Sequence, residues 1–139
     1  MSEVLYAQGK LESAEKLIRE EWEGLRRTLG NKHLRTQELS NVLGFVLHRQ
    51  GKLDKAELHF REELKMRRHL LGNEDSNTLA SLNNLSILLK DQGKLVGAEE
   101  LARELIGERP ATDLWHIRGK KILDDIDAAR KKKGGDKSP

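Results

Sequence analysis

The sequence predicts an all-α fold built from stacked antiparallel helix pairs, and three observations carry this prediction. Leucine recurs at helical spacing along almost the whole chain, and no proline occurs before Pro110. Charged residues make up 35% of the sequence and aromatic residues only 4%, which suits thin helices with charged outer faces. Finally, the sequence repeats itself every 42 residues, and periods of roughly 20 to 50 residues are typical of solenoids.

The repeat is marked by the tetrapeptide Gln-Gly-Lys-Leu, which begins at Gln8, Gln50 and Gln92. The same 42-residue shift aligns alanine, glutamate and arginine residues downstream of each tetrapeptide, and it aligns Leu-Gly-Asn at 29–31 with 71–73. A single repeat of this kind cannot bury its own apolar face, so the repeats are expected to stack on one another.

The repeats divide the chain into consecutive elements. A partial repeat is expected at 2–29, in which residues 2–8 supply the last turns of a first helix and Leu11 to Leu29 form its partner. Two further repeats are expected over about 36–71 and 78–107, followed by a capping helix over about 112–132. Residues 1–132 then form one repeat domain, and 133–139 are expected to be a disordered basic tail.

Each of the two later repeats reads as a helical hairpin. Thr36 and Thr78 are the expected N-caps of its first helix, and Gly51 and Gly93 end that helix because glycine accepts a left-handed conformation. The second helix begins near Leu53 or Leu95. The expected buried stripes contain Leu39, Leu43, Val46, Leu47, Leu82, Leu85, Leu88 and Leu89 in the first helices, and Leu53, Ala56, Phe60 and Leu64 in a second helix. In the capping helix they contain Leu114, Ile117, Ile122, Ile126 and Ala129.

The net charge of +3 comes from the C-terminal end of the chain. Residues 130–139 hold five of the 26 basic residues and one acidic residue, a net of +4, which leaves 21 basic and 22 acidic residues, a net of −1, in the other 129. Nucleic-acid or anionic-surface binding is therefore a less favoured hypothesis confined to the tail. The favoured reading is a solvated end that complements the C-terminal pole of the last helix.

The sequence lacks the residues that several classes of function require. There is no cysteine, and no apolar run approaches the roughly 18 residues needed to span a bilayer, so a cytoplasmic protein is expected. The five histidines show no pair at metal-ligand spacing, and Gly-Lys-Leu lacks the flanking residues of a phosphate loop. The pairs Glu20-Glu21 and Glu62-Glu63 diverge by about 100° around a helix. We therefore expect no enzyme activity, no cofactor, no metal and no small-molecule substrate.

The repeat residues taken together resemble the 42-residue tetratricopeptide repeats of kinesin light chain, over roughly residues 2–109. The resemblance is carried by Thr78-Leu79, Ser81-Leu82-Asn83-Asn84-Leu85, Leu88-Leu89, Gln92-Gly93-Lys94-Leu95, Ala98-Glu99, Arg67-Arg68 and Leu71-Gly72. One departure is that the usual His-Pro after the Leu-Gly turn is His33-Leu34 in one repeat and Asp75-Ser76 in the next. The resemblance implies a right-handed superhelix whose first helices line a concave, peptide-binding groove. It does not imply a kinesin subunit.

The groove positions of that family fall on two sets of residues in this chain. These are Asn41, Phe45 and His48 from one first helix, and Asn83, Ile87, Lys90 and Asp91 from the next. Asparagine amides can clasp a peptide backbone, Phe45 and Ile87 would form an apolar floor, and His48 and Lys90 favour an acidic ligand. An equally weighted alternative is that the asparagines bond to the neighbouring repeat, and Phe45 has a packing role as a further alternative.

Two hypotheses for function follow. The leading one is a non-catalytic protein-interaction module or scaffold that binds a peptide segment of a partner. The alternative is a structural fragment of a longer repeat array, or a module that self-associates through apolar surface near Val4, Leu5 and Leu17.

Overall fold

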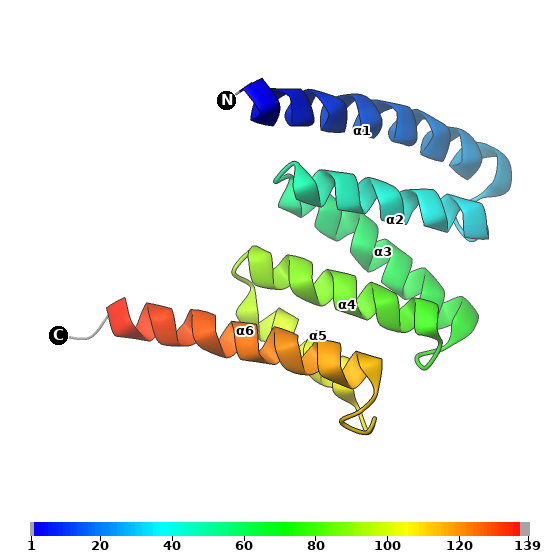
Figure 1. Ribbon diagram of the computed structural model, residues 1–139. Coiled ribbons are helices and arrows are strands. Elements are labelled where there is room, and N and C mark those ends of the chain that lie inside the picture. The colour runs from blue at the N-terminus through cyan, green and yellow to red at the C-terminus, as the bar shows by residue number, and fades with distance from the viewer. Residues whose placement is uncertain (1, 137–139) are drawn as a thin grey trace. The chain divides into compact units, whose positions relative to one another are not determined.

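Six helices make up the computed structural model (Figure 1), which describes the backbone of residues 2–136 and the side chains of residues 9–132. They are α1 (Ser2–Leu29), α2 (Leu34–Arg49), α3 (Leu53–Leu71), α4 (Ser76–Asp91), α5 (Leu95–Ile106) and α6 (Leu114–Asp136). The chain forms two compact units, residues 1–70 with α1, α2 and nearly all of α3, and residues 71–139 with α4, α5 and α6. The all-α prediction is confirmed for the described residues.

The first helix, α1, is continuous, so the prediction of separate helices at 2–8 and 11–29 is wrong. Gly51 and Gly93 both adopt φ of 80°, whereas Gly9 does not have a positive φ, although all three lie in the same tetrapeptide. Gly9 keeps a helical conformation, so α1 runs through the tetrapeptide without the chain reversal that occurs at Gly51 and Gly93.

The N-terminal caps of α2 and α4 lie three residues earlier than predicted. His33 Nδ1 accepts a hydrogen bond from the backbone N–H of Arg35 at 3.2 Å, and Asp75 Oδ1 accepts one from Asn77 at 2.9 Å. The prediction of Thr36 and Thr78 as N-caps is wrong, because both lie buried inside the first helical turn. The true caps nevertheless obey the 42-residue spacing.

The α2–α3 hairpin closes around an aromatic ring packed on a glycine. Phe60 on α3 is 1% exposed, and a Cβ atom at Gly44 would lie 2.7 Å from its Cε1 atom. The ring therefore rests directly on the backbone of α2. Leu43, Leu47 and Ala56 complete this core with no exposed surface.

The α4–α5 hairpin has a core of leucines and small residues. The predicted stripe of Leu82, Leu85, Leu88 and Leu89 is buried throughout. Ala98 and Ala102 on α5 are fully buried, and the Ser86 hydroxyl donates a hydrogen bond to the carbonyl of Ala98 at 2.8 Å. Small residues on both helices let α4 and α5 approach closely.

The last helix, α6, packs on α5 through a stripe that differs from the predicted one. Ile122 and Ile126 are buried as expected, but Leu114 and Ile117 are 53% and 52% exposed. The packed face instead begins at Gly119, where a Cβ atom would lie 2.9 Å from the carbonyl oxygen of Ala102. This contact sets the rotation of α6 and turns Leu114 and Ile117 outward.

The C-terminal part of α6 extends beyond its predicted end at 132 and continues to Asp136. Residues 137–139 of the expected tail lie outside the described residues. Arg130, one of the basic residues of this end, is hydrogen bonded to Glu99 of α5, which Arg103 also contacts at 3.1 Å. Among the helices described, none combines the length and the apolar character needed to cross a membrane.

Candidate protein-interaction surfaces

The second unit contains a cleft of about 390 Å³ between α4 and α6. On the α4 side it is lined by Asn83, Ile87 and Lys90, three of the four residues that the sequence places in the binding groove of this unit. All three are half-buried, as side chains that line a depression should be. The predicted set is thus brought together on one face, apart from Asp91, which is exposed and does not line the cleft.

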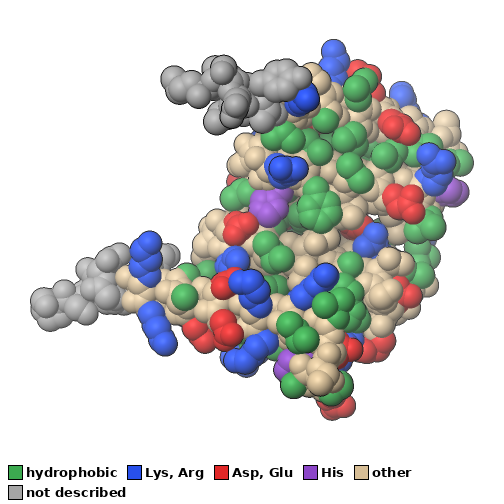
Figure 2. Space-filling view, viewed as in Figure 1, with side chains coloured by type: hydrophobic (Ala, Val, Ile, Leu, Met, Phe, Trp, Pro, Cys, Tyr) green, Lys and Arg blue, Asp and Glu red, His purple; other side chains and the backbone are tan. Residues whose placement is uncertain are grey.

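The opposite wall of this cleft comes from α6, which sequence reasoning assigned only to capping. Its residues in the cleft are Arg118, Lys121, Ile122 and Asp125. Their spacing of three to four residues was visible in the sequence and could have identified this face. The exposed surface of α6 in Figure 2 carries interspersed basic and acidic side chains, in keeping with this composition.

The cleft contains both basic and acidic side chains, with an excess of positive charge. Asp125 is shared between Lys90 Nζ at 3.4 Å and Lys121 Nζ at 3.3 Å, and these lysines help to lower its pKa against the opposing effect of desolvation. Arg118 lies over the ring of Trp115, with the guanidinium carbon 5.1 Å from the ring centroid. Three basic groups against one carboxylate give the cleft a formal charge of +2.

The predicted residues of the first unit lie on α2. Asn41 is half-buried, and its Oδ1 atom is buried with no hydrogen-bond partner among the described residues. Phe45 is 41% exposed, and its ring meets Phe60 edge-on at 5.4 Å between centroids. Phe45 therefore serves packing and also offers apolar surface. His48 is half-buried one turn further along α2.

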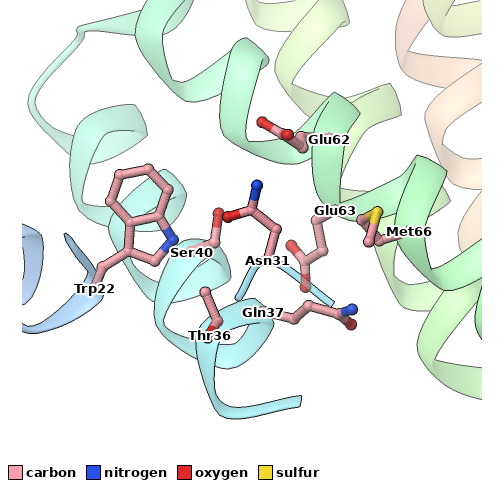
Figure 3. Close-up of a pocket in the computed structure, with 8 residues that line it drawn as sticks. All are labelled: Trp22, Asn31, Thr36, Gln37, Ser40, Glu62, Glu63 and Met66. Atoms are coloured by element: carbon pink, nitrogen blue, oxygen red, sulfur yellow. The ribbon is translucent and has the colours of Figure 1, made fainter. Parts of the chain in front are cut away.

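A separate, polar cavity of about 20 Å³ lies in the first unit among α1, α2, α3 and the turn before α2 (Figure 3). Its lining residues are Trp22, Asn31, Thr36, Gln37, Ser40, Glu62, Glu63 and Met66. Thr36, Gln37, Ser40 and Glu63 are buried, whereas Asn31 and Glu62 are exposed and mark its mouth. Sequence reasoning did not identify this cavity.

Glu63 is the most strongly perturbed group in the cavity. Its side chain has no exposed surface, and its Oε1 atom lies 2.6 Å from Nη2 of Arg67. Burial raises the pKa of Glu63 to about 7, and the nearby Arg67 guanidinium offsets only part of that effect. Its other oxygen, Oε2, is buried with no hydrogen-bond partner among the described residues.

Comparison with known proteins identifies the family. The family model described as tetratricopeptide repeat matches residues 1–69 and again residues 35–106. The chain belongs to the tetratricopeptide repeat family. Repeats of this family generally mediate protein–protein interaction or scaffolding. No curated protein matches the sequence.

A solved structure supports the same fold. The chain is similar to BtubC (BKLC) from P. vanneervenii, with a TM-score of 0.69 and 16% sequence identity over 94% of this chain. The match spans 60% of the BtubC chain. At this identity the similarity shows the fold alone, an all-α solenoid of tetratricopeptide-like helix pairs, and does not extend to function.

The 42-residue register of the tetratricopeptide repeats explains how the polar cavity could have been found from the sequence. Gln37, Ser40 and Glu63 in one repeat correspond to Leu79, Leu82 and Leu105 in the next. These leucines are at most 4% exposed. Three polar residues thus stand where the neighbouring repeat has an apolar core.

Some residues of the remaining sequence predictions lie outside the described part of the chain. The described residues contain no group of three or more side chains suited to hold a metal ion. Leu17 on α1 is 67% exposed, which the self-association hypothesis requires, but the side chains of Val4 and Leu5 are outside the described residues. Self-association through this face stays a prediction.

Proposed function

We propose that this tetratricopeptide repeat protein is a non-catalytic interaction module that holds an extended peptide segment of a partner protein. The observation that carries the proposal is the cleft between α4 and α6, which is lined by Asn83, Ile87 and Lys90. The 42-residue period supports assignment of these repeats to the kinesin-light-chain type.

The cleft offers the chemistry that peptide binding needs. The Asn83 amide has both donor and acceptor atoms, so it can bond to the backbone of an extended peptide regardless of the peptide sequence. Ile87 supplies apolar contact from the α4 wall, whereas Ile122 on the α6 wall is only 3% exposed and adds little surface. The excess of basic groups around Asp125 favours a segment that carries acidic residues.

We assign the same role to Asn41, Phe45 and His48 in the first unit. Asn41 is half-buried, and its amide carries the donor and acceptor groups that suit a peptide backbone. The exposed part of the Phe45 ring offers apolar contact area, and the ring is held in place by its edge-on contact with Phe60. A rigid aromatic side chain loses little conformational entropy on binding.

The decisive experiment uses peptides selected on the protein itself. Acidic peptides are selected from a displayed random library on the full chain, and their affinity is then measured by fluorescence anisotropy. The double variant Asn41→Ala/Asn83→Ala should lose about 1 to 3 kcal/mol of binding free energy, because it removes the asparagine hydrogen bonds proposed in each unit.

A matched control is available on the same helix. Asn84 neighbours Asn83 and is half-buried, but it does not line the cleft. Asn84→Ala should therefore leave the affinity unchanged. A double variant that keeps its helical circular dichroism and binds the selected peptides as tightly as the wild type would refute the groove assignment.

A further inference from the structure

The polar cavity of the first unit is distinct from the proposed peptide-binding residues. It opens among Trp22 of α1, the turn at Asn31, and residues of α2 and α3, whereas Asn41, Phe45 and His48 do not line it. Figure 3 shows the lining side chains, which come from these elements. The cavity therefore needs an explanation of its own.

The base of the cavity holds two buried acceptors that lack donors. Glu63 Oε2 and Thr36 Oγ1 are both buried with no hydrogen-bond partner among the described residues. Each residue is at most 2% exposed. Buried polar atoms are nearly always hydrogen bonded in folded proteins, so a donor that enters this cavity would be bound favourably.

The fold itself does not require polar groups at this place. The adjacent repeat has Leu79, Leu82 and Leu105 at the corresponding positions and buries them fully or nearly so. A buried carboxylate is costly compared with leucine unless its charge is compensated. Gln37 bonds to the Lys32 carbonyl, Ser40 contacts His59, and Arg67 pairs with one oxygen of Glu63. The unpartnered Oε2 atom of Glu63 is therefore the feature that the adjacent repeat lacks and that a ligand donor would satisfy.

The size and walls of the cavity restrict that ligand. A volume of about 20 Å³ accommodates one group of the size of a water molecule. Trp22 and Met66 provide apolar walls, and Glu62 adds a second carboxylate at the mouth. A carboxylate at the base, apolar walls and a second carboxylate at the mouth suit a small cationic head on a short methylene chain.

We propose that this cavity binds a primary ammonium group, with Glu63 Oε2 and Thr36 Oγ1 as acceptors at its base. The methylene chain then passes between Trp22 and Met66, and Glu62 faces the cation from the mouth. The ammonium group is supplied either by a lysine side chain of a partner peptide or by a free aliphatic amine. This cavity shares no lining residue with the cleft of the second unit.

The positive groups around the cavity are compatible with a cation. Arg67 is engaged with Oε1 of Glu63, and Arg26 lies over the Trp22 ring, so two guanidinium groups stand against the two carboxylates of Glu62 and Glu63; Oε2 of Glu63 has no hydrogen-bond partner among the described residues. The guanidinium carbon of Arg26 lies 4.8 Å from the centroid of the Trp22 ring, so this ring already interacts with one cation. The Nδ1 atom of His59 lies 3.0 Å from Oγ of Ser40. Burial lowers the pKa of His59, which favours the neutral form of its imidazole.

The test titrates the full chain with defined amines at constant ionic strength. Isothermal titration calorimetry should detect saturable binding of n-butylammonium chloride, and none of tetramethylammonium chloride, whose methyl groups neither fit the cavity nor donate hydrogen bonds. Comparing N-acetyl-lysine methylamide with putrescine then distinguishes a peptide lysine from a free amine, according to which binds more tightly.

Three variants test the assignment of Glu63. Glu63→Gln removes the charge at nearly constant shape, and Glu63→Leu introduces the residue of the adjacent repeat; both should weaken n-butylammonium binding by about tenfold or more. Glu38→Gln, an exposed acid on α2 outside the cavity, should leave it unchanged. Absence of saturable binding to the wild type overturns the proposal. Undiminished binding by a helical Glu63→Leu protein does so as well.

Discussion

The hairpins α2–α3 and α4–α5 are built on the same 42-residue register but fill their cores in opposite ways. Positions 44 and 60 hold glycine and phenylalanine in the first hairpin, and the equivalent positions 86 and 102 hold serine and alanine in the second. In the first, a large ring lies on bare backbone. In the second, both side chains are small, and the Ser86 hydroxyl donates a hydrogen bond to the backbone carbonyl of Ala98. The same backbone arrangement is thus stabilised either by the packing of a large ring or by a hydrogen bond, provided that both positions change together.

The two hairpins also differ in how polar their cores are near the turns. The first buries Glu63 beside Arg67, whereas the second buries Leu105 at the equivalent position. Replacing such a carboxylate by an apolar residue is often neutral or stabilising in other proteins, while breaking the pair from one side is costly. The first repeat therefore carries a polar element that the second shows to be dispensable for the fold.

The largest expected effect comes from removing the aromatic ring of the first hairpin. Phe60→Ala should lower the free energy of unfolding by about 3 to 5 kcal/mol, because the ring is 1% exposed and its loss leaves a cavity. Gly44→Ser alone should cost about 1 to 3 kcal/mol through overpacking against the ring. Urea unfolding of a Trp115→Phe background, with Trp22 as the fluorescent reporter of the first unit, measures both.

The double variant Gly44→Ser/Phe60→Ala completes this test, because it introduces the residue pair of the second hairpin. The serine should cost little once the ring is gone, so the combined loss should be smaller than the sum of the two single losses. Strict additivity would show that the ring and the glycine are not coupled.

A smaller effect is expected from pH. The pKa of Glu63 is about 7 in the folded protein and near 4.5 when unfolded, so the folded state binds the extra proton between these values. The stability of the first unit should therefore fall as pH rises through this window, by about 2 to 3 kcal/mol between pH 5 and 8 for this group. Unfolding of the Trp115→Phe protein by urea at several pH values measures the slope.

The Glu63→Leu variant isolates that contribution. His59 acts in the opposite direction, since its lowered pKa makes stability rise with pH as its proton is released from the unfolded chain. Glu15 does not interfere, because hydrogen bonds from Lys52 and Arg19 hold its pKa at about 2, below the range studied. The difference between wild type and Glu63→Leu should fall with rising pH; a flat difference would contradict a raised pKa.

The smallest effect is expected in the second hairpin. Ser86→Ala removes the hydrogen bond to the Ala98 carbonyl and should lower the free energy of unfolding by about 1 kcal/mol. A Trp22→Phe background, with Trp115 as reporter of the second unit, makes the measurement. A loss comparable to that of Phe60→Ala would show that the hydrogen bond, rather than the leucine core, holds α4 to α5.

Features that depend on local residue chemistry within one repeat could be predicted from the sequence. The turns at Gly51 and Gly93, the leucine stripe of α4, and the gathering of Asn83, Ile87 and Lys90 all follow from helical spacing and glycine conformation. These patterns need no knowledge of the neighbouring helix.

Features that depend on what packs against a helix could not be predicted in the same way. The same tetrapeptide makes a turn at Gly51 but not at Gly9, so these four residues alone do not determine whether the chain turns. The orientation of α6 depends on the approach of Gly119 to Ala102, which no periodicity in α6 reports. The polar cavity does not follow from the periodicity of any one helix, because Gln37, Ser40 and Glu63 come from two helices and differ from the pattern only by comparison with their leucine counterparts in the next repeat.

The close contact at Gly119 has a consequence for how this chain can change over evolutionary time. At Gly44 the neighbouring atoms belong to a side chain, so a second substitution at position 60 can make room for a larger residue. At Gly119 one of the nearest atoms is the carbonyl oxygen of Ala102, and no substitution of Ala102 moves its own backbone. Gly44 can therefore be replaced by a larger residue if residue 60 is replaced as well, whereas Gly119 can be replaced only if α5 and α6 move apart.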